Sequence, residues 1–174
     1  MKRFLCVCLI ALLALTPFAN AEKATFKTDK FYVKLQSDWV EIDNEEGSET
    51  KKYGRVTDDK YDLKRGYMVI MQVTQAGIAK NSTKAAIDKY LTSYITLFEL
   101  TGMLQLIGYD EISVSGKKRT VALIQMPDFG DELEDMYVTI VPGNGAYLLI
   151  IYGNSSLQNP KTELIEIIES VVVR

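Results

Sequence analysis

The chain of 174 residues contains no histidine, and its two cysteines, Cys6 and Cys8, both lie within the first eight residues. Histidine is the commonest general base and the commonest metal ligand among side chains, so most hydrolase triads and histidine metal sites are excluded. If the first residues are removed after synthesis, thiol catalysis and thiolate metal sites are excluded as well. The chemistry that is left must come from carboxylates, lysines, hydroxyls and aromatic rings.

Long apolar runs are scarce too, and the run from Phe4 to Leu15 stops at Thr16-Pro17. It is shorter than the roughly 20 residues that span a bilayer. Lys2 and Arg3 precede it, and Ala19-Asn20-Ala21 follows it as a small-x-small cleavage site. These three parts together predict a secretory signal peptide over residues 1–21.

Removal of residues 1–21 leaves a single predicted domain over residues 22–174. Because Lys2 and Arg3 leave with the signal peptide, the net charge falls from −3 for the chain to −5 for the remaining 153 residues. A domain of this size buries enough surface to fold without disulfides. The acidic balance argues against a nucleic-acid binder or an anionic-membrane binder. No second run long enough to span a membrane follows, so we expect no transmembrane segment after cleavage.

Hydrophobic periodicity predicts the elements of the first half. Residues 31–35 alternate as a strand with one buried face, and residues 66–73 are apolar on both faces, as in a central strand. The polar stretch 41–64 predicts a loop with at most short edge strands. Ser82 fits a helix N-cap and Gly102 a helix end. The helix face between them consists of Ile87, Tyr90, Leu91, Tyr94, Ile95 and Phe98.

Hairpins dominate the second half. Ile112 and Val114, a turn at Ser115-Gly116-Lys117, and residues 121–126 form one predicted hairpin. In a second, residues 136–141 pair with residues 146–152 across residues 142–145. Asn159 and Pro160 begin a closing helix with an apolar face formed by Leu164, Ile167, Ile168 and Val171. This order predicts an α+β domain, in which an antiparallel β-sheet is flanked by a long central helix and a C-terminal helix. A parallel βαβ arrangement is the alternative, although a single internal helix is visible.

Four features, which span most of the predicted domain, carry a family resemblance. They are an opening strand that closes in Leu35-Gln36-Ser37-Asp38-Trp39, the central helix, the Gly-Asn-Gly-Ala-Tyr-Leu-Leu hairpin at 143–149, and the final Ser170-Val171-Val172-Val173. Together they resemble the PsbP/Mog1-like fold, and in particular its small bacterial exported members, the DcrB-like and PsbP-like proteins. The resemblance implies the same architecture and an accessory, assembly or binding role rather than an enzyme. It assigns no functional residue to a position of this chain.

Ser115-Gly116-Lys117-Lys118 matches the Ser-x-x-Lys motif of a serine nucleophile with a lysine base. That mechanism needs the serine at a helix start beside a pocket, whereas this serine falls in a predicted hairpin turn. We therefore interpret the motif as a solvated turn. Gly143-Asn144-Gly145 lacks the lysine and hydroxyl of a phosphate loop and is also interpreted as a turn.

An acidic run lies between the two hairpins and consists of Asp128, Asp131, Glu132, Glu134 and Asp135. Carboxylates that converge on a loop could hold a hard cation such as Ca²⁺, with Asp128, Asp131, Glu132 and Asp135 as ligands. The spacing does not match an EF-hand loop. A polar connection that keeps the hairpins soluble is the alternative interpretation.

Four aromatic residues, Tyr32, Trp39, Tyr53 and Tyr67, form a candidate ligand or partner surface at one end of the sheet. Tyrosine and tryptophan combine apolar area with a polar group, which suits a binding cleft. Packing in the core or on the sheet is the competing interpretation. The charged segment 41–65 likewise is either a solvated loop or a surface for a partner.

These observations predict an exported, soluble accessory or binding protein of the cell envelope, periplasmic or extracellular, with no evident catalytic site and no cofactor. Its partner would be another envelope protein or a small ligand. The alternative function is a cation-dependent or carboxylate-based hydrolase that uses the acidic loop 128–135.

Overall fold

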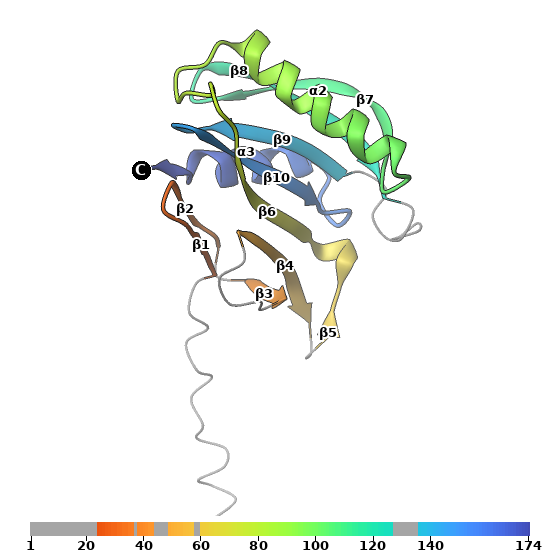
Figure 1. Ribbon diagram of the computed structural model, residues 1–174. Coiled ribbons are helices and arrows are strands. Elements are labelled where there is room, and N and C mark those ends of the chain that lie inside the picture. Colours follow the sequence, from red (N-terminus) through yellow and green to blue (C-terminus); the bar gives the residue numbers. More distant parts are fainter. Residues whose placement is uncertain (1–23, 37, 44–48, 58–59, 127–135) are drawn as a thin grey trace, which may run out of the picture.

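The computed structural model describes residues 24–36, 38–43, 49–57, 60–126 and 136–174, which form two antiparallel sheets with helices packed on the larger one (Figure 1). The small sheet has the order β1-β2-β11, and the large sheet has the order β3-β4-β6-β10-β9-β8-β7, with β5 paired to β4. This arrangement confirms the predicted α+β class, since every pairing is antiparallel.

The elements in chain order are β1 (Thr25–Lys27), β2 (Phe31–Lys34), β3 (Trp39–Asp43), β4 (Thr50–Thr57), β5 (Lys60–Tyr61), the 3₁₀ helix η1 (Leu63–Arg65), β6 (Tyr67–Thr74), α2 (Lys84–Leu100), β7 (Gln105–Val114), β8 (Lys117–Gln125), β9 (Met136–Pro142), β10 (Ala146–Gly153), α3 (Pro160–Glu169) and β11 (Val172–Val173). None of the helices in the described ranges has the length and apolar character needed to cross a membrane.

The large sheet is covered on both faces, which gives the domain three layers. In β10, the even-numbered side chains from Leu148 to Tyr152 pack with α3 and the small sheet, whereas the odd-numbered ones from Tyr147 to Ile151 pack with α2. Successive side chains of a strand point to opposite faces, so a strand covered on both sides must be apolar throughout. All residues of β9 and β10 are buried, and β6 lies inside the sheet as predicted.

The prediction of a loop with at most short edge strands over residues 41–64 is wrong for residues 50–57. β4 is an eight-residue strand that lies between β3 and β6, and its residues 50–54 pair with residues 67–71 of β6. Its composition is polar, yet Tyr53 is fully buried and Lys51 forms an ion pair with Glu41 at 2.6 Å. Cross-strand contacts of this kind override weak strand propensity.

The start of α2 differs from the prediction by one residue. Thr83 is the N-cap, and its side chain accepts a hydrogen bond from Ala86 N at 3.3 Å. The predicted cap, Ser82, is wrong because its Oγ atom accepts from Ala79 N at 2.9 Å and so closes the preceding turn. Both hydroxyls accept hydrogen bonds from backbone N–H groups, but only the hydroxyl of Thr83 caps the helix.

The predicted turns are confirmed by backbone geometry. Ser115 and Gly116 have φ values of +48° and +76° in the two-residue β7–β8 turn, so the Ser-x-x-Lys string lies in a hairpin. Gly145 has φ +75° in the β9–β10 turn, and Gly102 has φ +72° just after α2. At the end of α2 the amide of Met103 donates to the carbonyl of residue 98 at 3.0 Å, which completes a Schellman motif.

Candidate functional site

The structure divides the four predicted aromatic residues between separate places. Trp39 and Tyr53 are buried in the core cluster on the α3 side of the sheet, whereas Tyr67 is buried in the cluster on the α2 side. Tyr32 is half-buried on the small sheet, where the Arg174 guanidinium lies 5.6 Å from its ring centre. The structure therefore brings Trp39 and Tyr53 together and keeps Tyr67 on the opposite face.

The acidic run with Asp128, Asp131, Glu132 and Asp135 lies outside the described residues, so the cation site stays a prediction. Across the ranges that the structure describes, no group of three or more cysteine, aspartate or glutamate side chains is arranged to hold a metal ion. The charged segment 41–65 is only partly described, and its role as a partner surface also stays a prediction.

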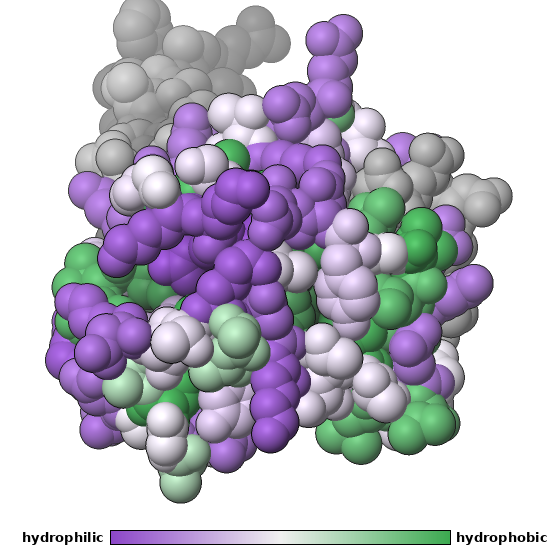
Figure 2. All heavy atoms as spheres, turned by 90° about the horizontal axis from the view of Figure 1, so that it is seen from above, coloured by the Kyte–Doolittle hydropathy of each residue, from purple (hydrophilic) through white to green (hydrophobic). Residues whose placement is uncertain are grey.

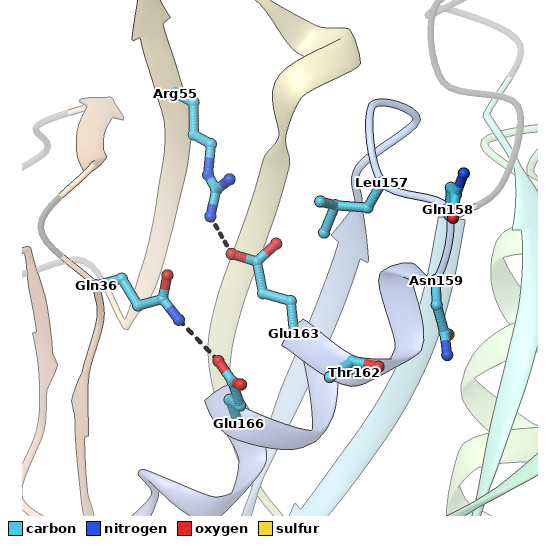
Figure 3. A pocket seen from close by; sticks show the side chains of 8 residues that line it. All are labelled: Gln36, Arg55, Leu157, Gln158, Asn159, Thr162, Glu163 and Glu166. Atoms are coloured by element: carbon cyan, nitrogen blue, oxygen red, sulfur yellow. Dashed lines mark hydrogen bonds and ion pairs between the residues drawn. The ribbon is translucent and has the colours of Figure 1, made fainter.

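A pocket of about 320 Å³ lies between β4 and the first half of α3 (Figure 3). We call it the Arg55–Glu163 pocket, after the two charged side chains that meet at its base. Gln36, from the loop after β2, forms one wall, and the segment that leads into α3 forms the opposite wall. The residues that line it are Gln36, Arg55, Leu157, Gln158, Asn159, Thr162, Glu163 and Glu166.

Glu163 is the centre of a buried polar network. Its side chain is only 7% exposed, although it belongs to a helix that faces an apolar core. One carboxylate oxygen accepts a hydrogen bond from Arg55 Nη2, and the other accepts from Tyr152 Oη at 2.5 Å and Asn154 Nδ2 at 3.0 Å. A buried carboxylate needs such donors, because an unpaired charge in a low-dielectric interior is very costly.

Two contacts besides Glu163 position Arg55. Its guanidinium carbon lies 4.8 Å from the ring centre of Trp39, in cation–π geometry. Its Nε atom forms an ion pair with Asp38 Oδ2 at 3.3 Å, without hydrogen-bond geometry. The Trp39 and Tyr152 rings are 6.2 Å apart and tilted by 60°, which links the arginine and the tyrosine through the tryptophan. The network therefore ties β3, β4, β10 and α3 together.

Gly66 makes room for this arrangement. A Cβ atom at position 66 would lie 2.7 Å from Cη2 of Trp39 and 3.2 Å from Cδ of Arg55, and the residue has φ +155°. Separations below 3 Å are not tolerated by real side chains, so the indole can occupy its place only beside a glycine. The packing of Trp39 thus depends on a residue that itself has no side chain.

Tyr152 acts in this network as a neutral donor. Burial, followed by the hydrogen bond to the Glu163 carboxylate, raises the pKa of Tyr152 above its ordinary value. Burial also raises the pKa of Tyr53 and Tyr94, with smaller contributions from Glu41 and Tyr147 respectively. We call Tyr53, Tyr94 and Tyr152 the three shielded tyrosines. A phenol that keeps its proton can hold a carboxylate in place, but it is a poor general base.

The rim of the pocket is more open than its base. Glu166 is exposed, and its Oε2 accepts a hydrogen bond from Gln36 Nε2 at 2.8 Å. Leu157 is 39% exposed and points toward the centre of the pocket in Figure 3. With one arginine and two glutamates, the lining carries a net negative charge. The rim can therefore receive an apolar group flanked by hydrogen-bond donors or a positive charge.

Four residues of this network were not predicted from the sequence as site residues: Arg55, Tyr152, Asn154 and Glu163. One signal for Glu163 was available, since it stands next to Leu164 and four residues before Ile167, inside the apolar face of the closing helix. A charged residue in that position needs a buried partner. Arg55 had no such signal, because it lies in the polar stretch that predicted a loop.

No protein-family model matches the sequence, and no curated protein matches it. Among solved structures, the chain is similar to the solution structure of cyanobacterial PsbP (CyanoP) from Synechocystis sp. PCC 6803. The TM-score is 0.54 at 9% sequence identity, and the match covers 91% of this chain and 96% of that chain. An identity this low carries information on the fold only. The order of elements, the three layers and this match agree with the resemblance found in the sequence, and the chain has a PsbP-like fold.

Proposed function

We propose that the chain is an exported, non-catalytic accessory protein of the cell envelope, which acts by binding another envelope protein at the Arg55–Glu163 pocket. The export part of the proposal rests on the pattern of residues 1–21. The accessory part rests on the PsbP-like fold and on the state of Glu163 in the pocket.

The proposal rests mainly on the internal pairing of the Glu163 carboxylate. One oxygen accepts from Arg55 and the other from Tyr152 and Asn154, so the group is committed to the network that joins α3 to the sheet. Such a group holds the pocket walls in place and leaves recognition to the rim. A rim with an exposed leucine, amide side chains and the Glu166 carboxylate suits a protein segment that presents a basic residue beside an apolar one.

Photo-crosslinking in the cells of origin tests this proposal. A photoreactive amino acid at Gln158, on the pocket rim, should capture a protein that is not captured from Lys89, an exposed position on α2. The charge reversal Glu166→Lys should abolish the adduct and should weaken binding of the purified partner. Capture of the same proteins from both positions, or an adduct that survives Glu166→Lys, would overturn the binding surface.

The hydrolase alternative has its own test. A cation held by the acidic loop 128–135 must stabilise the folded state, so millimolar Ca²⁺ or Mg²⁺ would raise the melting temperature. We expect no shift, and a shift that disappears in Asp131→Asn would favour the alternative. Export is checked separately, because the protein from the envelope fraction should begin at Glu22 and lack residues 1–21.

A further inference from the structure

Two adjoining hollows lie away from the Arg55–Glu163 pocket, and the larger one reaches the C-terminal end of α3. Their volumes are about 280 Å³ and 460 Å³, and they adjoin because Lys80, Asn81, Lys117, Arg119 and Pro142 line both. The start of α2, the β7–β8 turn and the end of β9 meet here, and Figure 1 shows the first two on the same side of the molecule. We call this place the basic pocket, after its five cationic residues, Lys80, Lys84, Lys117, Lys118 and Arg119.

The backbone around the basic pocket is held by hydrogen bonds between the segments. Lys80 N donates to Asn144 Oδ1 at 3.3 Å, and Gly145 N donates to Ile78 O at 2.9 Å, so the β9–β10 turn fixes the segment before α2. The turn that carries Lys117 is fixed from the other side, because Ser115 N donates to Glu169 Oε1 of α3 at 3.0 Å. The pocket is therefore formed without a ligand, which lowers the entropic cost of binding.

The charges of the pocket do not balance. Lys84 forms ion pairs with Asp88 at 2.6 Å and with Glu111 at 3.3 Å, and Lys118 forms one with Glu111 at 3.1 Å. Lys80, Lys117 and Arg119 have no ion-pair partner among the residues that the structure describes. Glu169 also lines the larger hollow, where it accepts hydrogen bonds from Ser115. Five cations thus face three carboxylates.

Arg119 is the least satisfied of these cations. It is half-buried, and its Nε atom is fully buried without a hydrogen-bond partner in the described part of the chain. Burial lowers the pKa of Arg119 from its ordinary value, and no nearby anion opposes that shift. A desolvated guanidinium without an acceptor is destabilising. Arg119 lines both hollows, so an anion held there would lie near its guanidinium and offset part of that cost.

The surroundings of the basic pocket are hydrophilic on this side of the molecule. Figure 2 looks down on α2, and purple side chains gather toward the end where the helix begins, while green ones gather toward the end where it finishes. The first turn of α2 contains no acidic residue, so its peptide dipoles add to the positive potential of the lysines. The remainder of the predicted mature domain is acidic, which makes this basic patch a local exception.

We propose that the basic pocket binds a phosphoryl group, carried either by a soluble phosphate compound or by the headgroup of an anionic lipid. A phosphoryl group presents up to two negative charges and three acceptor oxygens, which matches several unpaired N–H donors better than one carboxylate does. The hollows are large enough to admit it with part of the molecule that carries it. This site is separate from the Arg55–Glu163 pocket and does not depend on the function proposed for that pocket.

The test measures binding of pyrophosphate by calorimetry and of vesicles by sedimentation, with the purified protein at low ionic strength. Phosphatidylglycerol mixed with phosphatidylcholine provides the headgroup arm, and pure phosphatidylcholine is its control. The double variant Lys80→Ala/Lys117→Ala should weaken binding at least about tenfold, since the loss of one charge-assisted hydrogen bond alone lowers an affinity by close to that amount. The matched control Lys27→Ala/Lys89→Ala removes two exposed lysines elsewhere and should retain affinity within about twofold.

Arg119→Met gives a second readout that a merely structural arginine would not give. Without ligand, loss of an unpaired guanidinium should leave the melting temperature unchanged or raise it, because the aliphatic packing is kept. The rise in melting temperature on addition of pyrophosphate, or the binding to anionic vesicles, should disappear.

Binding of pyrophosphate alone would assign the site to a soluble phosphate compound, and binding of anionic vesicles alone would assign it to a lipid headgroup. Absence of binding in both arms would overturn the proposal. Equal weakening by the two double variants would also overturn it, because the attraction would then be a property of the net charge.

Discussion

Glu163→Gln is the most direct test of the buried polar network around Glu163. It keeps the shape of the side chain but removes its charge and one of its two acceptor oxygens. Arg55 is 11% exposed and Glu163 is 7% exposed, so solvent screens their interaction only weakly. After the substitution, Asp38 is the carboxylate that still pairs with Arg55, at 3.3 Å, and its own side chain is 50% exposed.

The expected loss of stability follows from these contacts. Removal of one partner of a buried ion pair costs about 3–5 kcal/mol, because the other charge is left uncompensated. Asp38 offsets part of this cost. The amide nitrogen of glutamine cannot accept a hydrogen bond, however, so a donor either of Arg55 or of the Tyr152 and Asn154 pair is also left unpaired, at about 1–3 kcal/mol. These effects overlap, and we expect the free energy of unfolding to fall by about 3–4 kcal/mol.

Urea unfolding monitored by fluorescence provides the measurement, since Trp39 is the single tryptophan of the chain and only 1% exposed. Circular dichroism should give the same midpoint if unfolding is two-state. Glu166→Gln is the matched control, because this exposed carboxylate on the same helix bonds to Gln36, and its loss should cost less than about 0.5 kcal/mol.

A double-mutant cycle with Arg55→Met separates the ion pair from other effects. The two substitutions together should cost less than the sum of the single ones by about 2 kcal/mol or more, since the double variant leaves no buried unpaired charge and Asp38, which loses its partner, is half exposed. A Glu163→Gln variant within about 1 kcal/mol of the wild type, or costs that simply add, would refute the network as a determinant of stability.

Three further predictions concern the packing of Trp39, the N-cap of α2 and the buried tyrosines. Gly66→Ala should lower the unfolding free energy by about 1–3 kcal/mol through the clash with the Trp39 ring, and wild-type stability would show that the ring moves aside without cost. Thr83→Ala should cost about 1 kcal/mol in the same assay and Ser82→Ala less, so the reverse order would contradict the assigned N-cap. The three shielded tyrosines have pKa values that are higher in the folded than in the unfolded state. Their contribution to the free energy of unfolding is therefore complete below about pH 10 and is lost as the pH rises through the folded-state pKa values. Urea unfolding at increasing pH should show stability falling above about pH 10 by up to about 1.4 kcal/mol per pH unit for each tyrosine, and a flat profile that Tyr152→Phe leaves unchanged would contradict this expectation.

Features that depend on a few neighbouring residues could be predicted from the sequence. The Ser115-Gly116 turn, the helix end at Gly102 and the start of α3 at Pro160 are determined by local backbone preferences. The two faces of β6 could be read from the apolar pattern, because burial on both sides leaves a continuous run. These local features were enough to indicate the PsbP-like fold.

Features that depend on distant contacts could not be predicted. β4 is polar in composition and becomes a strand because β3 and β6 provide partners on both sides. Arg55 and Glu163 are 108 residues apart in sequence, and nothing in the residues around Arg55 indicates that a glutamate of the last helix lies against it. Glu163 alone could have been recognised as unusual, but its partner could not be named without the sheet order.

The position of α3 shows why a buried ion pair is useful here. A ten-residue helix is marginal by itself, and α3 has no side-chain hydrogen bond at its N-cap and no basic residue in its last turn. Leu164, Ile167 and Ile168 form its apolar contact with the sheet, and they do not by themselves exclude a helix shifted along it. The hydrogen bonds of Glu166 with Gln36 and of Glu169 with Ser115 are exposed, so they oppose such a shift only weakly. Any such shift would move Glu163 away from Arg55 and leave a desolvated carboxylate against the core, at a cost of several kcal/mol. The apolar side chains hold α3 to the sheet, and we infer that Glu163 selects the one placement that forms the Arg55–Glu163 pocket.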